Sequence, residues 1–208
     1  MRQITLNKVF KKYKLSKNYA LKDISLTINK GESVGIIGEN GSGKSSLLKL
    51  IAQHIYPTKG TIFVDGDIET LFDNQILTDP FLSSDFIAKQ YLYLKDFSGD
   101  IEAKVSEIKK FCDIQDRFFD PFYTLSLGMK ARVQFAIKTS CYKQIVLVDE
   151  VLGAGDITTA KPCADRIKNI SSNSTFICVS HSLGQIKEFC QRCIWIKDGE
   201  IYDDSNTE

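Results

Sequence analysis

Apolar and polar residues alternate near the amino end of the chain, and this pattern predicts strands there. Apolar residues fall at about every second position in residues 3–10 (QITLNKVF) and 20–28 (ALKDISLTI). A period of two is typical of half-buried strands. Residues 33–38 (SVGIIG) are almost continuously apolar, which predicts a strand that is buried on both faces.

A helix and a further strand are predicted next. Residues 45–55 (SSLLKLIAQHI) have a helical pattern. Pro57 and Gly60 are expected to end this helix, because proline lacks the backbone donor that a helix needs. Residues 61–66 (TIFVDG) predict a strand. A buried strand, a Gly-rich turn and a helix therefore follow one another in this part of the chain.

The middle of the chain, from about Gln75 to Lys138, is predicted to be mostly helical. Its apolar series at helical spacing are Phe86, Ile87, Tyr91 and Leu94, and then Ile101, Val105, Ile108 and Cys112. Strands and helices alternate afterwards, in residues 145–150, 158–170, 174–180, 183–190 and 193–202. This alternation is typical of a parallel sheet covered on both faces.

The pattern as a whole predicts one α/β domain with a helical insertion. Its core would consist of residues 1–74 and 139–208, and the inserted helical subdomain of residues 75–138. The final stretch, DDSNTE, is expected to be a frayed end.

The composition is that of a soluble globular protein. Of the 208 residues, 43% are hydrophobic and 25% are charged, so a sizeable core can form and dominant disorder is excluded. A formal net charge of +1 argues against a dedicated nucleic-acid-binding protein. The start, MRQITLNKVFKKYK, lacks the apolar segment of a secretory signal, and no apolar run approaches the ~18 residues of a spanning helix. We expect a cytosolic protein.

The six cysteines are expected to be reduced, because disulfides are rare in the cytosol. Cys190 and Cys193 form a lone C-x-x-C. The chain has no second pair or His pair at zinc-ligand spacing, so these cysteines are interpreted as core thiols.

The motif that carries the chemistry lies between the buried strand and the helix. Residues 38–45 (GENGSGKS) fit the phosphate-loop pattern G-x-x-x-x-G-K-[ST], in the strand-to-helix context that it requires. Glycines let successive N–H groups point at an anion, and the helix N-terminus adds positive charge. Lys44 can reach the β and γ phosphates, and Ser45 can offer its hydroxyl to Mg²⁺. The predicted nucleotide-binding residues are Gly38, Glu39, Asn40, Gly41, Ser42, Gly43, Lys44, Ser45 and Ser46.

Three further polar residues follow predicted core strands. Asp149 and Glu150 end the apolar run IVLVDE, at the strand end where ligands bind in open α/β sheets. Asp149 would bind the nucleotide's Mg²⁺, and Glu150 would polarise the attacking water. His181 follows the strand TFICVS and could hydrogen-bond both the γ phosphate and water. A lone histidine is more often structural, but this position favours a catalytic role.

Residues 125–129 (LSLGM), between the phosphate loop and the DE pair, are similar to the LSGGQ signature of the ATP-binding-cassette (ABC) ATPases. The resemblance extends over nearly the whole chain. It implies a P-loop NTPase core with a parallel sheet, an N-terminal antiparallel β subdomain and an inserted helical subdomain. It also implies an ATP hydrolase that works as a homodimer, in which Ser126 and the N–H groups around Gly128 contact the γ phosphate held by the other subunit.

The resemblance assigns roles to other segments as well. Residues 154–156 (AGD) match the dimer-facing D-loop, and Tyr13 matches the aromatic residue that stacks on adenine. Tyr19 is a rival for that stacking role. Most members have a Mg²⁺-binding glutamine at the junction of core and helical lobe, where residues 72–73 (FD) stand here. Gln75 is the nearest glutamine, and its role is left open.

Two motifs look like those of ATPases that serve bacterial surface-polysaccharide exporters. Residues 126–137 (SLGMKARVQFAI) and 149–156 (DEVLGAGD) are similar to SxGMxARLxFA and DExLAVGD of that group, which handles capsular polysaccharide, O-antigen and teichoic acid. The chain ends soon after its last core strand, as in the short members. The resemblance implies a peripheral subunit on the cytoplasmic face of the inner membrane, attached only through an integral permease. The alternatives are another kind of ABC transporter subunit, a soluble ABC ATPase, and a nucleotide-gated module without turnover.

The resemblance also implies a docking region for the permease, in a groove between core and helical lobe lined by residues 71–93. Its apolar residues include Phe72, Ile76, Leu77, Phe81, Leu82 and Phe86. Several of them are expected to be exposed, since an exposed apolar patch marks an interaction site. The other interpretation is that they form the core of the helical lobe itself.

Overall fold

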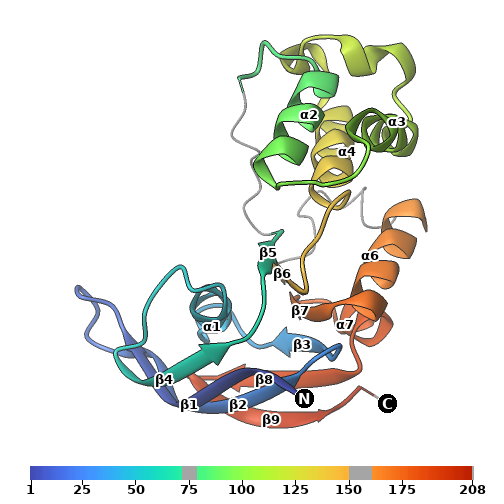
Figure 1. Ribbon diagram of the computed structural model, residues 1–208. Helices are drawn as coiled ribbons and strands as arrows, with labels where there is room; N and C mark the ends of the chain where they lie inside the picture. Colours follow the sequence, from blue (N-terminus) through green and yellow to red (C-terminus); the bar gives the residue numbers. More distant parts are fainter. Residues whose placement is uncertain (72–78, 150–160, 208) are drawn as a thin grey trace. The chain divides into compact units, whose positions relative to one another are not determined.

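The computed structural model describes residues 1–71, 79–149 and 161–207, which form two compact units (Figure 1). The first unit contains residues 1–71, 143–149 and 167–207, and the second contains residues 79–142 and 161–166. Several residues singled out above lie outside the described ranges: Phe72, Asp73, Gln75, Ile76, Leu77, Glu150, Ala154, Gly155 and Asp156.

The first unit contains an antiparallel sheet with the strand order β2-β1-β4. Its strands are β1 (Arg2–Lys12), β2 (Tyr19–Asn29) and β4 (Lys59–Val64). Ile4 pairs with Ile28 across the ladder, and Leu6 pairs with Leu26. All four side chains are buried in the same core cluster, so the predicted half-buried strands are confirmed.

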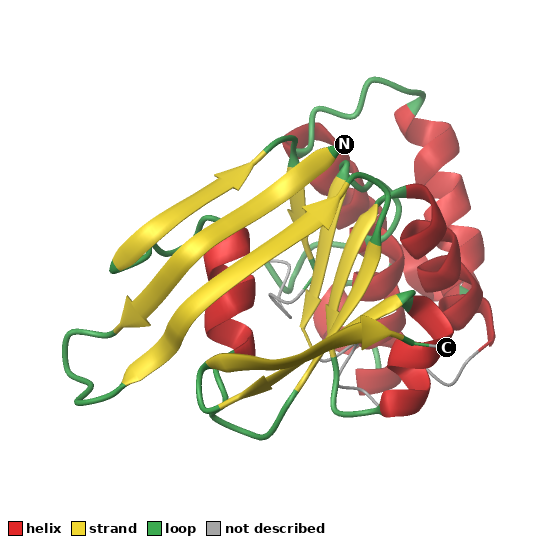
Figure 2. Ribbon diagram, turned by 90° about the horizontal axis from the view of Figure 1, so that it is seen from below, coloured by secondary structure: helices red, strands yellow, loops and turns green. Residues whose placement is uncertain are grey.

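The first unit also contains a mixed sheet with the strand order β5-β6-β7-β3-β8-β9. Figure 2 shows the strands of the chain in yellow. The strands of the mixed sheet are β3 (Ser33–Ile37), β5 (Ile68–Thr70), β6 (Ile145–Asp149), β7 (Thr175–Val179), β8 (Arg192–Lys197) and β9 (Glu200–Asn206). Strands β5, β6, β7, β3 and β8 are parallel, and β9 is antiparallel to β8. The carboxyl ends of β3, β6 and β7 therefore lie along one edge of the sheet.

Helices cover the core strands of this unit. Helix α1 (Lys44–Ile51) contributes its apolar side chains to a core cluster shared with both sheets. Ile145 and Leu147 of β6 join this cluster, while Val146 and Val148 are buried on the opposite face. Helix α7 (Leu183–Phe189) packs against β3. Helix α6 spans Lys161–Asn173, and its residues from 167 on belong to this unit.

Helix α1 is shorter than the sequence pattern predicts. It ends at Ile51, well before Pro57, and Gln53 has a φ of 59°. A residue in the left-handed region stops the helical hydrogen-bond pattern, so the prediction that Pro57 and Gly60 end the helix is wrong.

The carboxyl-terminal segment also differs from the prediction. Residues 193–202 do not form one strand, because the chain turns back at Asp198 and Gly199, whose φ angles are 52° and 83°. Two successive positive φ angles are typical of a type I′ turn, for which Asp-Gly is a favoured pair. The return strand β9 includes residues 203–206 and pairs with β8 over its length. The prediction that these residues fray is therefore wrong.

The second unit is built of helices around its own core. They are α2 (Ser84–Leu94), α3 (Ile101–Cys112), α4 (Leu127–Lys138) and the short 3₁₀ helices η1 (Gln115–Phe119) and η2 (Phe122–Thr124). The predicted apolar face of α3 is confirmed, since Val105, Ile108 and Cys112 are buried. Among the described helices of the whole chain, none is long and apolar enough to cross a membrane.

The predicted apolar face of α2 is confirmed only in part: Ile87 is buried and Tyr91 packs against the core of the unit, but the other two residues do not. Leu94 is 82% exposed and Phe86 is 46% exposed, whereas Ala88 and Leu92 are buried. Asp85 and Lys89, on the other side of the helix, form an i,i+4 ion pair. The exposed apolar residues of α2 remain available to a partner.

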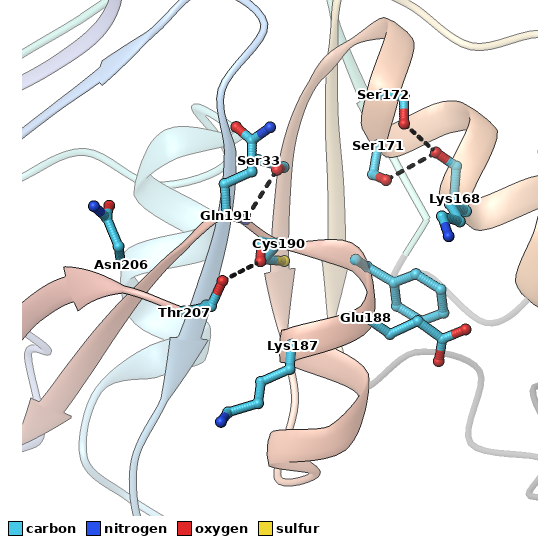
Figure 3. Close-up of a pocket in the computed structure, with 11 residues that line it drawn as sticks. Ser33, Lys168, Ser171, Ser172, Lys187, Glu188, Cys190, Gln191, Asn206 and Thr207 are labelled. Carbon is cyan, nitrogen blue, oxygen red and sulfur yellow. Dashed lines mark hydrogen bonds between the residues drawn. The ribbon is translucent and has the colours of Figure 1, made fainter.

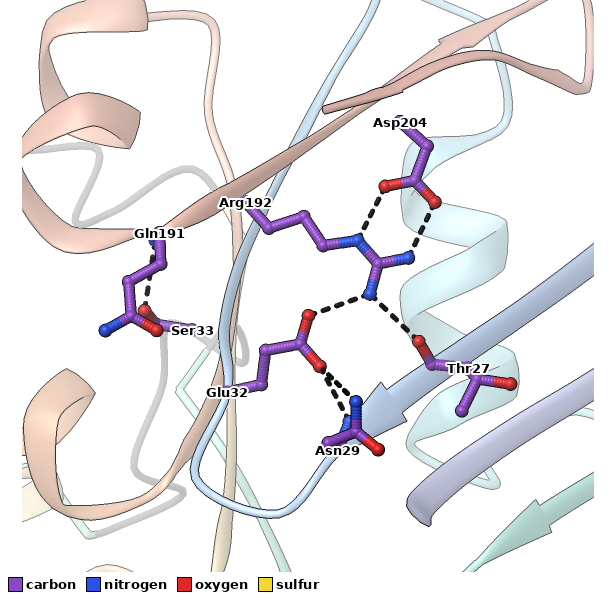
Figure 4. Close-up of polar contacts among 7 residues, drawn as sticks. All are labelled: Thr27, Asn29, Glu32, Ser33, Gln191, Arg192 and Asp204. Carbon is purple, nitrogen blue, oxygen red and sulfur yellow. Dashed lines mark hydrogen bonds and ion pairs between the residues drawn. The ribbon is translucent and has the colours of Figure 1, made fainter. Parts of the chain in front are cut away.

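A polar network ties the two sheets of the first unit together (Figure 4). The Arg192 guanidinium donates two hydrogen bonds of 2.6 Å to the Asp204 carboxylate, one of 2.8 Å to Glu32, and one of 2.9 Å to the Thr27 carbonyl. Glu32 also accepts from the Asn29 backbone N–H. These hydrogen bonds to Asp204 raise the pKa of Arg192 although burial opposes the shift.

All six cysteines are free thiols. Cys190 is buried, as its interpretation as a core thiol requires, whereas Cys193 is partly exposed, so that interpretation holds only in part for the pair. Cys112, Cys163 and Cys178 are buried too, and Cys141 is partly exposed. Burial raises the pKa of the Cys112 thiol to about 12, so this thiol is protonated at neutral pH.

Candidate nucleotide-binding site

The predicted phosphate loop follows β3 and lies tightly against neighbouring backbone. Gly38 has a φ of 153°, and a Cβ atom there would lie 2.2 Å from the Ile196 carbonyl oxygen. Gly43 has a φ of 110°, and a Cβ atom there would lie 2.5 Å from the Ala20 carbonyl oxygen. Only glycine fits at these positions, because any side chain would collide with the backbone. The loop is thereby fixed between β8 and β2.

Lys44 begins helix α1 and points back into this loop. Its Nζ donates hydrogen bonds of 2.8 Å to the Gly38 carbonyl and 2.9 Å to the Glu39 carbonyl, and the residue is only 6% exposed. The N-terminal N–H groups of α1 also converge on this region. A buried ammonium beside a helix N-terminus suits the phosphate groups of a nucleotide.

The register of the sheet brings other predicted residues to the same edge. Asp149 pairs with Val179 of β7, and Val179 pairs with Ile36 of β3. Neighbouring strands lie ~4.8 Å apart, so the backbone of Asp149 is roughly 10 Å from that of Ile36, just before the loop. His181 follows β7 at this edge and is exposed. The loop, Asp149 and His181 therefore share the edge where ligands bind in open α/β sheets.

The polar groups at this edge fit a nucleotide with Mg²⁺. The Ser42 hydroxyl is buried and lacks a hydrogen-bond partner within the described residues, so it is left for a ligand to satisfy. Ser45 is exposed in the first turn of α1, and Asp149 is partly buried. Hydroxyl and carboxylate oxygens are the ligand types that Mg²⁺ prefers. The roles of these residues, and that of Glu150 beyond the described range, stay predictions.

Ser126 and Gly128 lie in the second unit, at the start of α4. Ser126 is the N-cap, and its Oγ accepts a hydrogen bond of 3.3 Å from the Met129 N–H. Leu127 is 85% exposed, and a Cβ atom at Gly128 would meet nothing within 4 Å. The amino end of α4 is thus exposed at Leu127 and Gly128, where the first N–H groups of a helix lack intrahelical acceptors.

Tyr13 contacts the phosphate-loop helix. Its hydroxyl lies 3.1 Å from the Ser46 Oγ, and its side chain is exposed at 40% relative accessibility. Tyr19 is less exposed and packs edge-on against Phe10, with ring centroids 5.8 Å apart. The sequence motif alone did not indicate the contact between Tyr13 and Ser46.

The family model for ABC transporters matches residues 21–153. The chain belongs to the ABC transporter family. Residues 38–45 and 125–129 both fall inside the matched region, so the predicted family, and with it the α/β cassette fold, is confirmed.

Relatives of this ABC protein include export ATP-binding proteins. The chain is 36% identical to the teichoic acids export ATP-binding protein TagH of Listeria monocytogenes, over 92% of its own length and 57% of that protein. It is 37% identical to the O-antigen export system ATP-binding protein RfbE of Yersinia enterocolitica, over 89% of its own length and 79% of that protein. The chain therefore spans little more than half of the Listeria relative.

Solved ABC cassettes have the same fold. The dimeric structure of MJ0796, a bacterial ABC transporter cassette, is 28% identical, with a TM-score of 0.81 and 99% of both chains covered. A dimeric post-hydrolysis state of MJ0796 bound to ADP and Pi is 26% identical, with a TM-score of 0.80 and the same coverage.

The described part of the predicted docking region contains both exposed and packed residues. Phe81 is 72% exposed and contacts Tyr123 edge-on, at a centroid distance of 5.3 Å. Phe86 is also exposed, while Leu82 is partly buried against the helical core. The exposure of Phe81 and Phe86 agrees with the interpretation as an interaction site. The packing of Leu82 agrees with the interpretation as core of the helical lobe.

A polar pocket of about 530 Å³ lies in the first unit (Figure 3). Ser33 begins β3, Gln191 precedes β8 and Thr207 follows β9, so the pocket lies at the amino ends of β3 and β8. The phosphate loop follows the opposite end of β3. The pocket is therefore separate from the candidate nucleotide site.

Proposed function

We propose that this ABC protein binds ATP with Mg²⁺ at residues 38–46 and hydrolyses it to drive export of a cell-surface polysaccharide. The observation that carries the nucleotide part is the buried Lys44 ammonium, held in a glycine loop at the sheet edge that also holds Asp149. This arrangement supports phosphoryl transfer, which depends mainly on positioning and charge neutralisation.

Each residue at the edge has a distinct proposed role. Lys44 binds the β and γ phosphates, and Ser45 and Asp149 hold Mg²⁺. Mg²⁺, when bound, supplies positive charge against the phosphate oxygens. Glu150 orients and polarises the attacking water, and His181 hydrogen-bonds the γ phosphate and that water. The glycine loop packs tightly against the backbone of Ile196 and Ala20, which supports its role in positioning the phosphates.

The proposed active unit is a homodimer with two composite sites. In each site Ser126 and the open N–H groups around Gly128 contact the γ phosphate that the other subunit holds. A helix N-terminus facing an anion gives this contact its physical basis. One two-fold axis would generate both sites, and the dimeric form of MJ0796 supports such an arrangement.

The proposed substrate is a polysaccharide such as teichoic acid, O-antigen or capsular polysaccharide. This part rests on the names of the relatives from Listeria and Yersinia and on the motifs that the sequence shares with exporters. The chain would associate with an integral permease at the cytoplasmic face of the membrane. Phe81 and Phe86 are proposed to contribute to that contact.

Replacing Lys44 tests the nucleotide part. Lys44→Ala removes the charge on the β and γ phosphates, and truncating a partner of a charged group costs several kcal/mol, so ATP affinity should fall at least ~30-fold. Lys49→Ala, at an exposed position of the same helix, is the matched control and should bind like the wild type. Titration with ATP and Mg²⁺ measures both. Equal affinity of the two variants would contradict the assignment.

Co-purification tests the transport part. The ATPase and a co-encoded permease should purify together in detergent, and Phe81→Ser should weaken the complex while ATP binding is kept. Phe119→Ser, at another exposed aromatic position of the second unit, is the control. In cells without the wild-type protein, Lys44→Ala should fail to restore surface polysaccharide. Normal surface polysaccharide in those cells would refute the proposed export role.

A further inference from the structure

Basic residues are concentrated in the first strand and the turn that follows it. Residues 1–22 contain seven of the 27 basic residues and none of the 26 acidic ones. The rest of the chain therefore has 20 basic and 26 acidic residues, so the net charge of +1 combines a positive amino-terminal segment with a negative remainder. A charge asymmetry of this kind indicates a surface that meets an anionic partner.

The turn between β1 and β2 is closed by hydrogen bonds and projects from one end of the antiparallel sheet (Figure 1, Figure 2). The Ser16 N–H donates to the Tyr13 carbonyl at 3.0 Å, and the Ser16 hydroxyl donates to the Asn18 carbonyl at 2.8 Å. The first of these bonds closes a reverse turn whose central residues are Lys14 and Leu15. Both side chains are exposed there, and Leu15 is completely so, at 102% relative accessibility.

The segment before β4 lies beside the end of β1, where this turn begins. The Lys11 Nζ donates a hydrogen bond of 2.7 Å to the Tyr56 carbonyl. The Lys12 N–H donates one of 2.9 Å to the Thr58 hydroxyl. Tyr56 is 84% exposed, and Lys59, the first residue of β4, is exposed as well. We call the exposed basic and apolar residues of these two segments the basic tip; they are Lys12, Lys14, Leu15, Lys17, Tyr56 and Lys59.

The basic tip combines positive charge with exposed apolar side chains. Among the ion pairs of residues 1–71, 79–149 and 161–207, none involves one of its four lysines. Its leucine and tyrosine are almost wholly in contact with solvent. An anionic lipid surface suits both kinds of side chain. Its headgroups attract lysines, and the boundary between headgroups and acyl chains accepts leucine and tyrosine.

We propose that the basic tip binds directly to anionic phospholipid headgroups at the membrane surface. Leu15 and Tyr56 enter the headgroup region, while the four lysines stay among the lipid phosphates. A nucleic acid would attract the same lysines, but it offers no apolar phase for Leu15, so the exposure of that side chain favours lipid. The contact goes beyond the permease attachment that the family resemblance implies, and it does not depend on ATP binding.

Sedimentation with lipid vesicles tests the proposal on the whole chain. Vesicles of phosphatidylglycerol and phosphatidylcholine in equal parts should carry the protein into the pellet, whereas vesicles of phosphatidylcholine alone should not. Raising the salt from about 0.1 M to about 1 M, which shortens the Debye length from about 10 Å to about 3 Å, should release most of it. No permease is present in this assay, so the binding it measures is direct.

Two double variants with the same net charge distinguish the basic tip from charge in general. Lys14→Gln/Lys17→Gln removes two charges from the tip. Its affinity for the mixed vesicles should fall about 25-fold, since each lysine near an anionic surface contributes roughly five-fold. Lys168→Gln/Lys187→Gln, at exposed positions of the same unit, is the matched control and should bind like the wild type. Both double variants should keep their ATP affinity.

Substitutions of Leu15 test whether the partner is a lipid phase. Leu15→Ser should weaken binding to the mixed vesicles about five-fold, because less apolar surface leaves water. Leu15→Trp should bind them at least as well as the wild type. Its fluorescence emission should shift to shorter wavelengths on the vesicles, beyond any shift of the wild type, because an indole ring settles in the membrane interface.

Three results would overturn the proposal. One is that the wild type stays in the supernatant with the mixed vesicles at low salt. Another is an equal loss of binding in the two double variants, which would assign the effect to net charge. The third is that Leu15→Ser binds vesicles like the wild type while single-stranded RNA displaces both, which would identify a general polyanion surface. None of these results bears on the proposed function, which ATP titration and co-purification in detergent test separately.

Discussion

Arg192 joins three segments of the first unit through one guanidinium. Asp204 of β9, Glu32 before β3 and the Thr27 carbonyl of β2 all accept its hydrogen bonds. The side chains of Arg192 and Glu32 are about one-fifth exposed, at 20% and 18%. Ion pairs at such partly buried positions contribute more than surface pairs, because removal of one partner leaves the others poorly solvated.

Arg192→Leu should therefore destabilise the fold by about 2 kcal/mol, the range for hydrogen bonds to charged groups. Urea unfolding measures the loss. Lys22→Met is the matched control, since Lys22 and Glu200 form an exposed pair at 3.9 Å in the same unit. Removing such a pair should cost less than about 1 kcal/mol. Equal losses of unfolding free energy in the two variants would show that the Arg192 network stabilises the fold no more than an exposed ion pair does.

Cys112 is a residue whose ionisation the fold suppresses. Burial raises its pKa from 9.0 to about 12. Because the folded pKa is the higher one, the associated stability is complete below pH 9 and is lost as the pH rises from 9 toward 12. At pH 8.5, iodoacetamide should modify Cys112 at least ~100-fold more slowly than the partly exposed Cys141, since the thiolate is the reactive form. Mass spectrometry of the alkylated peptides measures both rates, and similar rates would contradict the burial of Cys112.

At the scale of one element, Ser126 at the start of helix α4 has two roles that substitutions can separate. The side chain caps the helix, and in the proposed dimer it also meets the γ phosphate. Ser126→Ala should cost about 1 kcal/mol of stability, whereas Ser126→Asp keeps a good cap and should preserve stability. Both variants should lose ATPase activity, the second because two negative charges would face each other. An active Ser126→Asp enzyme would show that the residue only caps the helix.

The sequence predicts best the elements whose structure follows from residues adjacent in the chain, such as a run of apolar residues or a group of glycines. Strands β3, β6 and β7 are continuous apolar runs, and the glycines of residues 38–43 mark the loop, because no other residue fits beside Ile196 and Ala20. Strand β9 is exposed on most of its length and has no alternation of apolar residues, so the pattern did not predict it. The Asp198-Gly199 pair before it favours a turn and could have indicated the return strand. The buried face of α2 and the contact between Tyr13 and Ser46 depend on tertiary packing, which one sequence pattern does not encode.

At the scale of the whole molecule, Glu150→Gln should separate ATP binding from hydrolysis. The substitution keeps the shape but removes the charge that polarises water, so turnover should fall at least ~100-fold while ATP binding persists. ATP should then hold two chains together, because cleavage no longer releases the shared phosphate contacts. Light scattering after size-exclusion chromatography, with and without ATP, measures the dimer. Glu188→Gln, at an exposed position of α7, should stay active and show no such trapping.

The position of β3 in its sheet has a consequence for biosynthesis. This strand, at residues 33–37, lies between β7 and β8, which come from residues 175–179 and 192–197. A ribosome that has translated the chain only as far as β6 therefore exposes a phosphate loop whose strand has neither neighbour. Such distant pairings fold slowly and leave apolar edges open. A nascent chain of this protein should thus gain the ability to bind nucleotide only after β7 and β8 emerge, and until then its central strand is a target for chaperones.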